Sequence, residues 1–171
     1  MHLRGQNPLR ATLLTAMTLC VVSASGLAAR QMPQFTLTDQ DGRARAVTYP
    51  HGKVSVFVVA DHKGSSEIAG WIAPLYQRYE QRIDLAGIAA LPRIPPMFKG
   101  LFRREFKKRL TFPVMLDWTG DVARSVDYEN NRAQLLVVGR SGRIALTKSG
   151  PANEQALAEV IAEIDRQRSD R

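Results

Sequence analysis

Two apolar runs separated by an amphipathic stretch dominate the pattern of hydrophobic and polar positions. Residues 53–60 (KVSVFVVA) and 82–91 (RIDLAGIAAL) are nearly continuous in apolar side chains, which is typical of strands buried on both faces of a sheet. Residues 66–82 place apolar side chains at helical spacing, and Pro74 is expected to kink that helix. The apolar positions are Ile68, Trp71, Ile72, Leu75, Tyr76 and Tyr79. Two such strands joined by a helix predict a parallel pair with a right-handed crossover.

Shorter patterns on either side of this unit predict further elements of one α/β domain. Residues 30–50 begin with alternating apolar positions and contain the turn signal Asp41-Gly42, which indicates a short hairpin. A turn at 140–142 is expected to join two antiparallel strands near the C-terminus. The remaining elements are a short strand or extended segment at 111–117, strands at 133–139 and 143–150, and helices at 120–128 and 151–166.

The first 29 residues have the composition of a secretory signal peptide. Arg4 and Arg10 precede an apolar stretch over 11–22, and small residues over 23–29 supply a cleavage site. The alternative is an uncleaved membrane anchor, but a spanning helix needs ~20 strongly apolar residues, and threonines and serines interrupt this stretch. We therefore expect a periplasmic domain of residues 30–171, which would be membrane-anchored if the segment is not cleaved.

Charge and cysteine content narrow the classes of function. The chain carries 24 Lys and Arg against 16 Asp and Glu, a net charge of +8. Residues 30–171 keep 22 of those basic residues and all 16 acidic ones, which leaves +6. The single cysteine, Cys20, lies in the predicted signal peptide, so the domain that follows contains no thiol. Disulfides persist in the oxidising compartments that exported proteins reach, yet this domain must rely on its apolar core alone.

The order of the elements and four short segments resemble the redoxin form of the thioredoxin-like fold, which includes peroxiredoxins and TlpA-like thiol–disulfide proteins. The segments are PQFTLTDQDGR at 33–43, GKVSVFVVA at 52–60, FPVMLDWTGDVARSVDY at 112–128 and LLVVGRSGRI at 135–144. The resemblance implies one domain whose central mixed sheet of four or five strands is flanked by helices, with a basic helical insertion at about 92–110. Among these families, the chain is most similar to the cysteine-poor, periplasmic YtfJ-like proteins.

The resemblance also locates the positions at which redoxins carry reactive cysteines. Thioredoxins place a kinking proline five residues after the second cysteine of Cys-x-x-Cys, and counting back from Pro74 reaches Ala69 and Ser66. Peroxiredoxins place their peroxide-reactive cysteine five residues after an aspartate, and counting on from Asp61 also reaches Ser66. A third mark, a cis-proline, falls near Ala133 and is absent.

Disulfide exchange and peroxide reduction both need a thiolate, which a serine hydroxyl cannot replace. The resemblance therefore implies a non-catalytic binding or accessory protein of the bacterial envelope rather than an enzyme. The alternative is a redoxin-class oxidoreductase that acts only with a partner's thiols.

Lys63, Ser66 and Arg132 form a candidate anion or ligand site. By resemblance to peroxiredoxins, Lys63 takes the place of the active-site threonine, and Arg132 lies one residue from the place of the family's arginine. A helix N-terminus with a hydroxyl and two cations nearby can hold an anion. The alternative is that Ser66 or Ser65 only caps the helix, while both cations are solvated.

Metal and hydrolase chemistry have little support in the sequence. Beyond residue 29 the histidines are His51 and His62, which could meet Asp61 at the mouth of the first buried strand. A metal site needs three or four converging ligands, so we expect no metal and no other cofactor. A hydrolase built from Ser66 and His62 would lack the Gly-x-Ser-x-Gly turn.

A basic segment with a regular apolar stripe follows the second buried strand. The stripe recurs every four residues, at Phe98, Phe102, Phe106 and Leu110. Six cations, which we call the basic surface, accompany it: Lys99, Arg103, Arg104, Lys107, Lys108 and Arg109. This pattern is typical of helices that lie on an anionic membrane or an acidic protein partner. The alternative is a helix docked on the domain by its phenylalanines. Nucleic acid is not an expected partner, because export separates the protein from the cell's nucleic acids.

Overall fold

The computed structural model describes residues 30–92, 94–109 and 112–170, so the predicted signal peptide with Cys20, and Leu110, lie outside the described residues. The strands are β1 (Phe35–Asp39), β2 (Ala44–Val47), β3 (Ser55–Ala60), β4 (Asp84–Ala90), β5 (Val114–Asp117), β6 (Gln134–Val138) and β7 (Ile144–Ser149). The α-helices are α1 (Ile68–Tyr79), α2 (Lys99–Arg109), α3 (Asp121–Ser125) and α4 (Glu154–Ser169). Short 3₁₀ turns are η1 (Gly64–Glu67), η2 (Glu80–Arg82) and η3 (Pro96–Phe98).

The sheet has seven strands in the order β2-β1-β5-β4-β3-β6-β7, not the four or five that the resemblance implied. The three central strands β3, β4 and β5 are parallel, as predicted for β3 and β4, and the outer pairs are antiparallel. The difference lies in the N-terminal hairpin, because Thr38 and Asp39 pair with Leu116 and Met115 of β5. That pairing makes the hairpin part of the central sheet.

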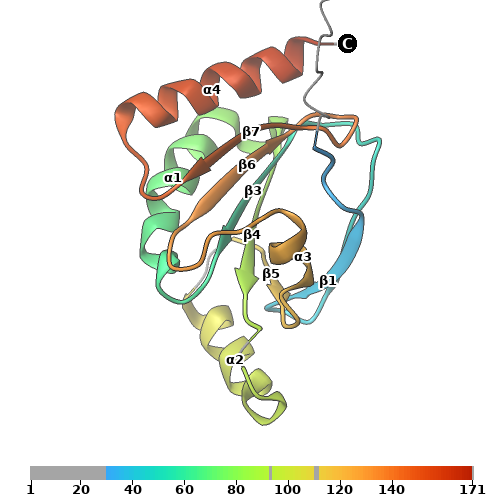
Figure 1. The fold of residues 1–171 in the computed structure, drawn as a ribbon, viewed down its shortest axis with the longest axis vertical. Helices are drawn as coiled ribbons and strands as arrows, with labels where there is room; N and C mark the ends of the chain where they lie inside the picture. The colour runs from blue at the N-terminus through green and yellow to red at the C-terminus, as the bar shows by residue number, and fades with distance from the viewer. Residues whose placement is uncertain (1–29, 93, 110–111, 171) are drawn as a thin grey trace, which may run out of the picture.

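Apolar side chains of β3, and of Val54 just before it, alternate between two cores, one on each face of the sheet. Val54, Val56 and Val58 face a core that α1 and α4 cover, whereas Phe57 and Val59 face a core beneath α3 and the hairpin. Figure 1 shows α1 and α4 together on one side of the sheet and α3 on the other. The continuous apolar run is thus explained by burial on both faces, as the sequence pattern predicts.

Helix α1 is shorter than the predicted 66–82, because a 3₁₀ turn replaces the α-helix at each end. Pro74 lies inside it, and the apolar positions Trp71, Ile72, Leu75 and Tyr79 are buried as expected. Tyr76 was expected on the same face, but 60% of its surface is exposed, so that prediction is wrong. Its position is one turn from Ile72 on the edge of the buried stripe, where a small rotation of the helix carries a side chain into solvent.

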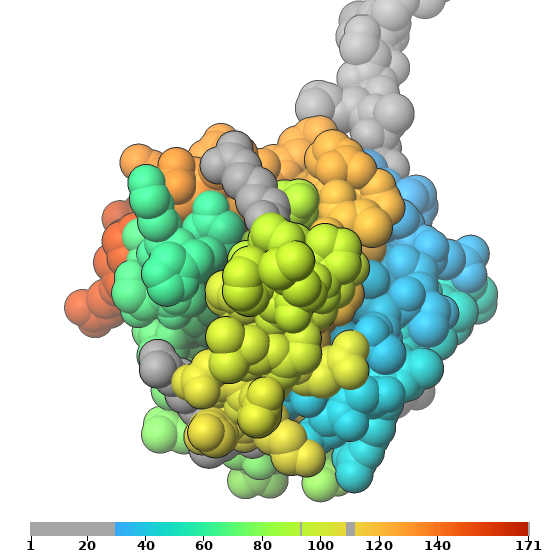
Figure 2. All heavy atoms as spheres, turned by 90° about the horizontal axis from the view of Figure 1, so that it is seen from below, coloured from blue at the N-terminus to red at the C-terminus, as the bar shows by residue number. Residues whose placement is uncertain are grey.

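Helix α2 extends from the end of the domain away from the other helices (Figure 1). Figure 2 views the molecule from that end, and residues of η3 and α2 occupy the centre of the face in yellow-green. None of the helices within the described residues is both long and apolar enough to span a membrane.

Candidate functional site

The end of β3 and the start of α1 lie against the segment that leads into β6, and we call residues 61–67 together with 128–133 the strand-end site. Ser66 lies in η1, within one turn of the start of α1, as both counts from the sequence predict. Ala69 lies in the first turn of α1, and the side chains of both residues are exposed. The two positions that would hold redox-active cysteines therefore face solvent at the N-terminal end of α1.

The prediction that Ser65 or Ser66 caps the helix is wrong. The Ser65 hydroxyl donates to the His62 carbonyl at 2.7 Å, and the Ser66 hydroxyl donates to the Lys63 carbonyl at 3.4 Å. Because η1 extends the helical backbone through both serines, their hydroxyls point back to carbonyls three residues earlier, as serines inside helices do. Neither serine hydroxyl therefore accepts a hydrogen bond from a backbone N–H at the start of the helix.

Asp61 organises the strand-end site through backbone N–H groups. Its Oδ1 accepts from the Gly64 N–H and its Oδ2 from the Asn131 N–H, each at 2.9 Å. Burial alone would raise the pKa of this carboxyl, but hydrogen bonds from the N–H groups of Gly64, Asn131 and Lys63 outweigh it, so the pKa lies below its ordinary value. Asp61 is thus a charged group that joins two segments 70 residues apart in sequence.

Tyr128 adds a second connection between the same segments. Its hydroxyl accepts from the Asp61 N–H and donates to the Arg132 carbonyl, both at 2.8 Å. Burial of this hydroxyl, together with the nearby charge of Asp61, raises the pKa of Tyr128 to about 12. The hydroxyl therefore stays protonated at physiological pH and cannot serve as a base there.

Hydrogen bonds and close packing within the chain hold the backbone around Arg132 and Ala133 in place. A carboxylate oxygen of Glu67 accepts from the Ala133 N–H at 2.8 Å, and the Ala133 carbonyl accepts from the Gly150 N–H at 2.8 Å. Gly64 approaches so closely that a Cβ atom there would lie 2.3 Å from the Arg132 carbonyl oxygen. A proline at 133, the family mark that is absent, would lack the N–H that Glu67 binds.

Asp61, Glu67 and Tyr128 are the site residues that sequence reasoning did not assign. Asp61 served as a counting anchor and as a possible neighbour of His51 and His62, although Asp61 with Gly64 three residues later is a recognised turn signature. The bond between Glu67 and Ala133 has no comparable signal, because it joins residues 66 positions apart.

Lys63, Ser66 and Arg132 lie close in the fold through their backbones, because Gly64 touches the Arg132 peptide. All three side chains are exposed, and the Ser66 hydroxyl donates to the Lys63 backbone carbonyl, but among the described residues no hydrogen bond or ion pair joins one of these side chains to another. The Asp61 carboxylate already occupies backbone N–H groups at the start of η1 that an anion would use. The candidate anion site therefore stays a prediction.

The expectation that His51, Asp61 and His62 could meet is wrong. His51 precedes β3, and its Nε2 lies 2.5 Å from an oxygen of Asp84, at the opposite end of that strand from Asp61 and His62. Six strand residues at roughly 3.3 Å each separate the two ends. In the part of the chain that the structure describes, no three side chains of the metal-binding types gather in one place.

The basic surface is partly paired with the domain. Lys107 lies 3.2 Å from Asp41, Lys108 lies 3.9 Å from Glu105, and the Lys99 ammonium lies 5.4 Å from the centre of the Trp118 ring. Arg104 is exposed, Arg103 is half-buried, and the side chain of Arg109 lies outside the described residues.

The phenylalanine stripe on the same helix is divided between the domain and solvent. Phe106 packs on a core cluster beneath the helix, and Phe102 is half-buried. Phe98 is 45% exposed, and it lies beside two apolar side chains that the sequence analysis did not single out, Met97 at 81% and Leu101 at 50%. The exposed apolar side chains are thus concentrated where η3 passes into α2.

Comparisons with known proteins agree with this architecture. The sequence matches no protein-family model, and a search of curated proteins finds no match. Among solved structures, a candidate thiol:disulfide interchange protein DsbE from Chlorobium tepidum is similar at a TM-score of 0.63 and 14% identity, with 82% of this chain and 97% of that chain covered. The exposed lipoprotein thioredoxin Etrx1 from Streptococcus pneumoniae is similar at a TM-score of 0.62 and 15% identity, with 77% and 99% covered. StoA from Bacillus subtilis is similar at a TM-score of 0.58 and 16% identity, with 76% of this chain and 97% of that chain covered.

These similarities show the fold of the described domain. That fold is thioredoxin-like, as the order of the segments predicted from sequence. The fold is shared at low sequence identity, so the chemistry of this chain has to be argued from its own residues.

Proposed function

We propose that this protein is an exported, thioredoxin-like binding or accessory protein of the bacterial envelope that performs no thiol chemistry. The observation that carries the proposal is Ser66 at the start of α1, where the fold would hold a reactive cysteine. Support for export comes from the signal-like composition of residues 1–29 and from a structural neighbour described as an exposed lipoprotein.

The contacts within the strand-end site argue against catalysis there. Glu67, Gly64 and Tyr128 all hold the Arg132–Ala133 segment in place, so its polar groups are satisfied within the chain. No group there is both nucleophilic and activated, since the Ser66 hydroxyl donates to a carbonyl and the Tyr128 pKa is raised. The alternative is a redoxin-class oxidoreductase that uses a partner's thiols. Its domain of residues 30–171 would supply no thiol to the reaction.

Partner capture tests this proposal against that alternative. The full chain carrying Cys20→Ser would be used as bait on envelope extracts of its own bacterium, and captured proteins would be alkylated with a mass tag. We expect captured partners whose pattern of free and oxidised thiols is the same with and without the bait. A shift in a partner's thiol state that depends on the bait would favour the oxidoreductase.

A second candidate function is attachment to an anionic membrane surface through the basic surface. The specific observation in its favour is the exposure of Met97, Phe98 and Leu101 next to that surface. Apolar side chains that insert at the headgroup boundary, flanked by cations, are the combination that interfacial helices use. A cation near an anionic leaflet contributes on the order of 1 kcal/mol.

Vesicle co-sedimentation tests the second candidate. We expect the full chain to bind phosphatidylglycerol vesicles at low salt and to bind less at molar salt, where the Debye length falls to ~3 Å. Met97→Ser with Leu101→Ser and Arg104→Glu should weaken the salt-sensitive binding about tenfold or more, since burying one such apolar side chain is worth about 1.5–3 kcal/mol. Arg124→Glu, a charge reversal far along the chain, is the matched control. Equal binding by both variants would attribute the interaction to another part of the chain, residues 1–29 included.

A further inference from the structure

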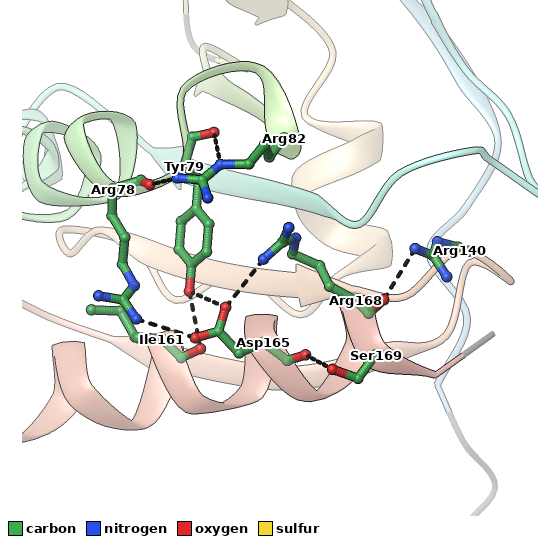
Figure 3. A network of polar contacts seen from close by, with 8 residues as sticks. All are labelled: Arg78, Tyr79, Arg82, Arg140, Ile161, Asp165, Arg168 and Ser169. Atoms are coloured by element: carbon green, nitrogen blue, oxygen red, sulfur yellow. Dashed lines mark hydrogen bonds and ion pairs between the residues drawn. The ribbon is translucent and has the colours of Figure 1, made fainter.

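Three arginines surround one buried tyrosine where α1 and α4 end (Figure 3). The guanidinium carbons of Arg78, Arg82 and Arg168, which we call the arginine cluster, lie 5.6, 5.9 and 5.6 Å from the centre of the Tyr79 ring. Any two of these cations therefore lie within about twice that distance of each other. The cluster is at the opposite end of α1 from the strand-end site, so it forms a separate feature of the molecule.

Among the described residues that line this pocket, one carboxylate opposes the three cations. Asp165 lies 3.3 Å from Arg78 and 3.4 Å from Arg168, and it accepts a hydrogen bond from the Tyr79 hydroxyl at 3.0 Å. Burial would raise the pKa of Asp165, but the hydrogen bonds from Tyr79 and Arg78 outweigh it, and the pKa lies below its ordinary value. Asp165 is therefore ionised at neutral pH, and the lining residues carry a net charge of +2.

Arg82 is the member of the cluster whose described hydrogen bonds are to uncharged groups. Its Nε donates to the Tyr79 carbonyl at 3.2 Å, and a terminal nitrogen donates to the Arg78 carbonyl. These carbonyls belong to the C-terminal end of α1, where a helix carries roughly −0.5 of a charge. Even if α1 and α4 each contribute that amount, about one positive charge in the pocket is left uncompensated.

The pocket is open and large enough for a ligand. Its volume is about 380 Å³, against the roughly 30 Å³ that one water occupies in the liquid. The Arg78 side chain is 52% exposed and that of Arg168 is 32% exposed, so both can reach a ligand from solvent. The hydrogen bonds to carbonyls and to Asp165 fix the direction of each guanidinium before any ligand arrives.

We propose that the arginine cluster binds an oxyanion of the phosphate class, either free phosphate or a phosphate monoester. Guanidinium groups present paired N–H donors that match the oxygens of phosphate, and bonds between charged groups are about twice as strong as neutral ones. This inference is independent of the proposed function, because the cluster shares no residue with the strand-end site. A phosphate on the head group of a lipid would be a different source of the same chemistry.

Isothermal titration of the full chain with inorganic phosphate and with phenyl phosphate, at constant ionic strength, tests the proposal. We expect saturable binding of one oxyanion, and about tenfold weaker binding by Arg82→Gln, which removes charged donors. Arg43→Gln, which removes an exposed cation in the β1–β2 turn, is the matched control and should bind as the natural chain does. Arg168→Gln provides a second variant if circular dichroism shows that Arg82→Gln is unfolded.

Three outcomes would overturn the proposal. The first is no saturable heat with either phosphate probe on the natural chain. The second is an equal loss of affinity in Arg43→Gln, which would indicate attraction to overall charge alone. The third is binding only to vesicles that contain phosphatidic acid, which would transfer the site to a membrane surface.

Discussion

Replacing Trp71 by alanine is expected to remove about 3–5 kcal/mol from the free energy of unfolding, the range for a large buried aromatic side chain. Trp71 is 1% exposed and packs in the core between the sheet, α1 and α4. Its indole N–H also donates to the Gly150 carbonyl at 2.9 Å. Domains of this kind are stable by about 5–15 kcal/mol in total, so urea denaturation followed by circular dichroism would show a large shift of the midpoint.

Two further variants separate packing from hydrogen bonding in this prediction. Trp71→Phe keeps most of the aromatic volume but leaves the buried Gly150 carbonyl without its donor, which is expected to cost about 1–3 kcal/mol. Tyr76→Ala, on the same helix but 60% exposed, should change stability by no more than about 0.5 kcal/mol. A loss in Trp71→Ala no larger than that of Tyr76→Ala would contradict the described packing of α1.

The elements that sequence alone predicts well are those whose signal is local and redundant. The run at 53–60 is apolar at nearly every position, and β3 is buried along its whole length. The helix that follows has the expected buried stripe around Trp71, so the parallel unit could be built from pattern alone. Counting back from Pro74 and counting forward from Asp61 both located Ser66 near the start of that helix.

The size of the sheet could not be predicted in the same way. Whether the hairpin joins the central sheet depends on the pairing of Thr38 and Asp39 with β5, more than 70 residues along the chain. Backbone hydrogen bonds between distant strands depend on register, which apolar alternation constrains only weakly where a strand has few buried apolar positions, as in β1.

The contacts of the strand-end site were equally hidden from the sequence. Glu67 reads as one more helix-start carboxylate, and only the fold brings it to the Ala133 N–H. Gly64 reads as a loop glycine, whereas its role is to let two backbones approach each other. The expectation that Ser65 or Ser66 caps the helix was wrong for a related reason. The 3₁₀ turn η1 directs both hydroxyls to carbonyls three residues earlier.

The chain is expected to show no thiol–disulfide or peroxidase turnover. Both reactions begin with attack by a thiolate, and the only cysteine, Cys20, lies in the predicted signal peptide. The start of α1 can lower the pKa of a thiol placed there. It cannot make a nucleophile of the Ser66 hydroxyl, which is bound to a carbonyl.

A variant with two cysteines at the start of α1 provides a positive control for the expected lack of activity. Ser66→Cys with Ala69→Cys places two thiols three residues apart on an exposed face where η1 passes into α1. Side chains at this spacing are neighbours on a helix. The double variant is therefore expected to form an intramolecular disulfide and to acquire slow insulin reduction, while its fold is unchanged.

The most direct test is dithiothreitol-dependent insulin reduction, with peroxide consumption in parallel, by the full chain carrying Cys20→Ser. The account predicts rates equal to the buffer background for this chain and a measurable rate for the same chain with cysteines at 66 and 69. Insulin reduction or peroxide consumption above background by the cysteine-free, metal-free chain would contradict the proposal that this thioredoxin-like domain works without redox chemistry.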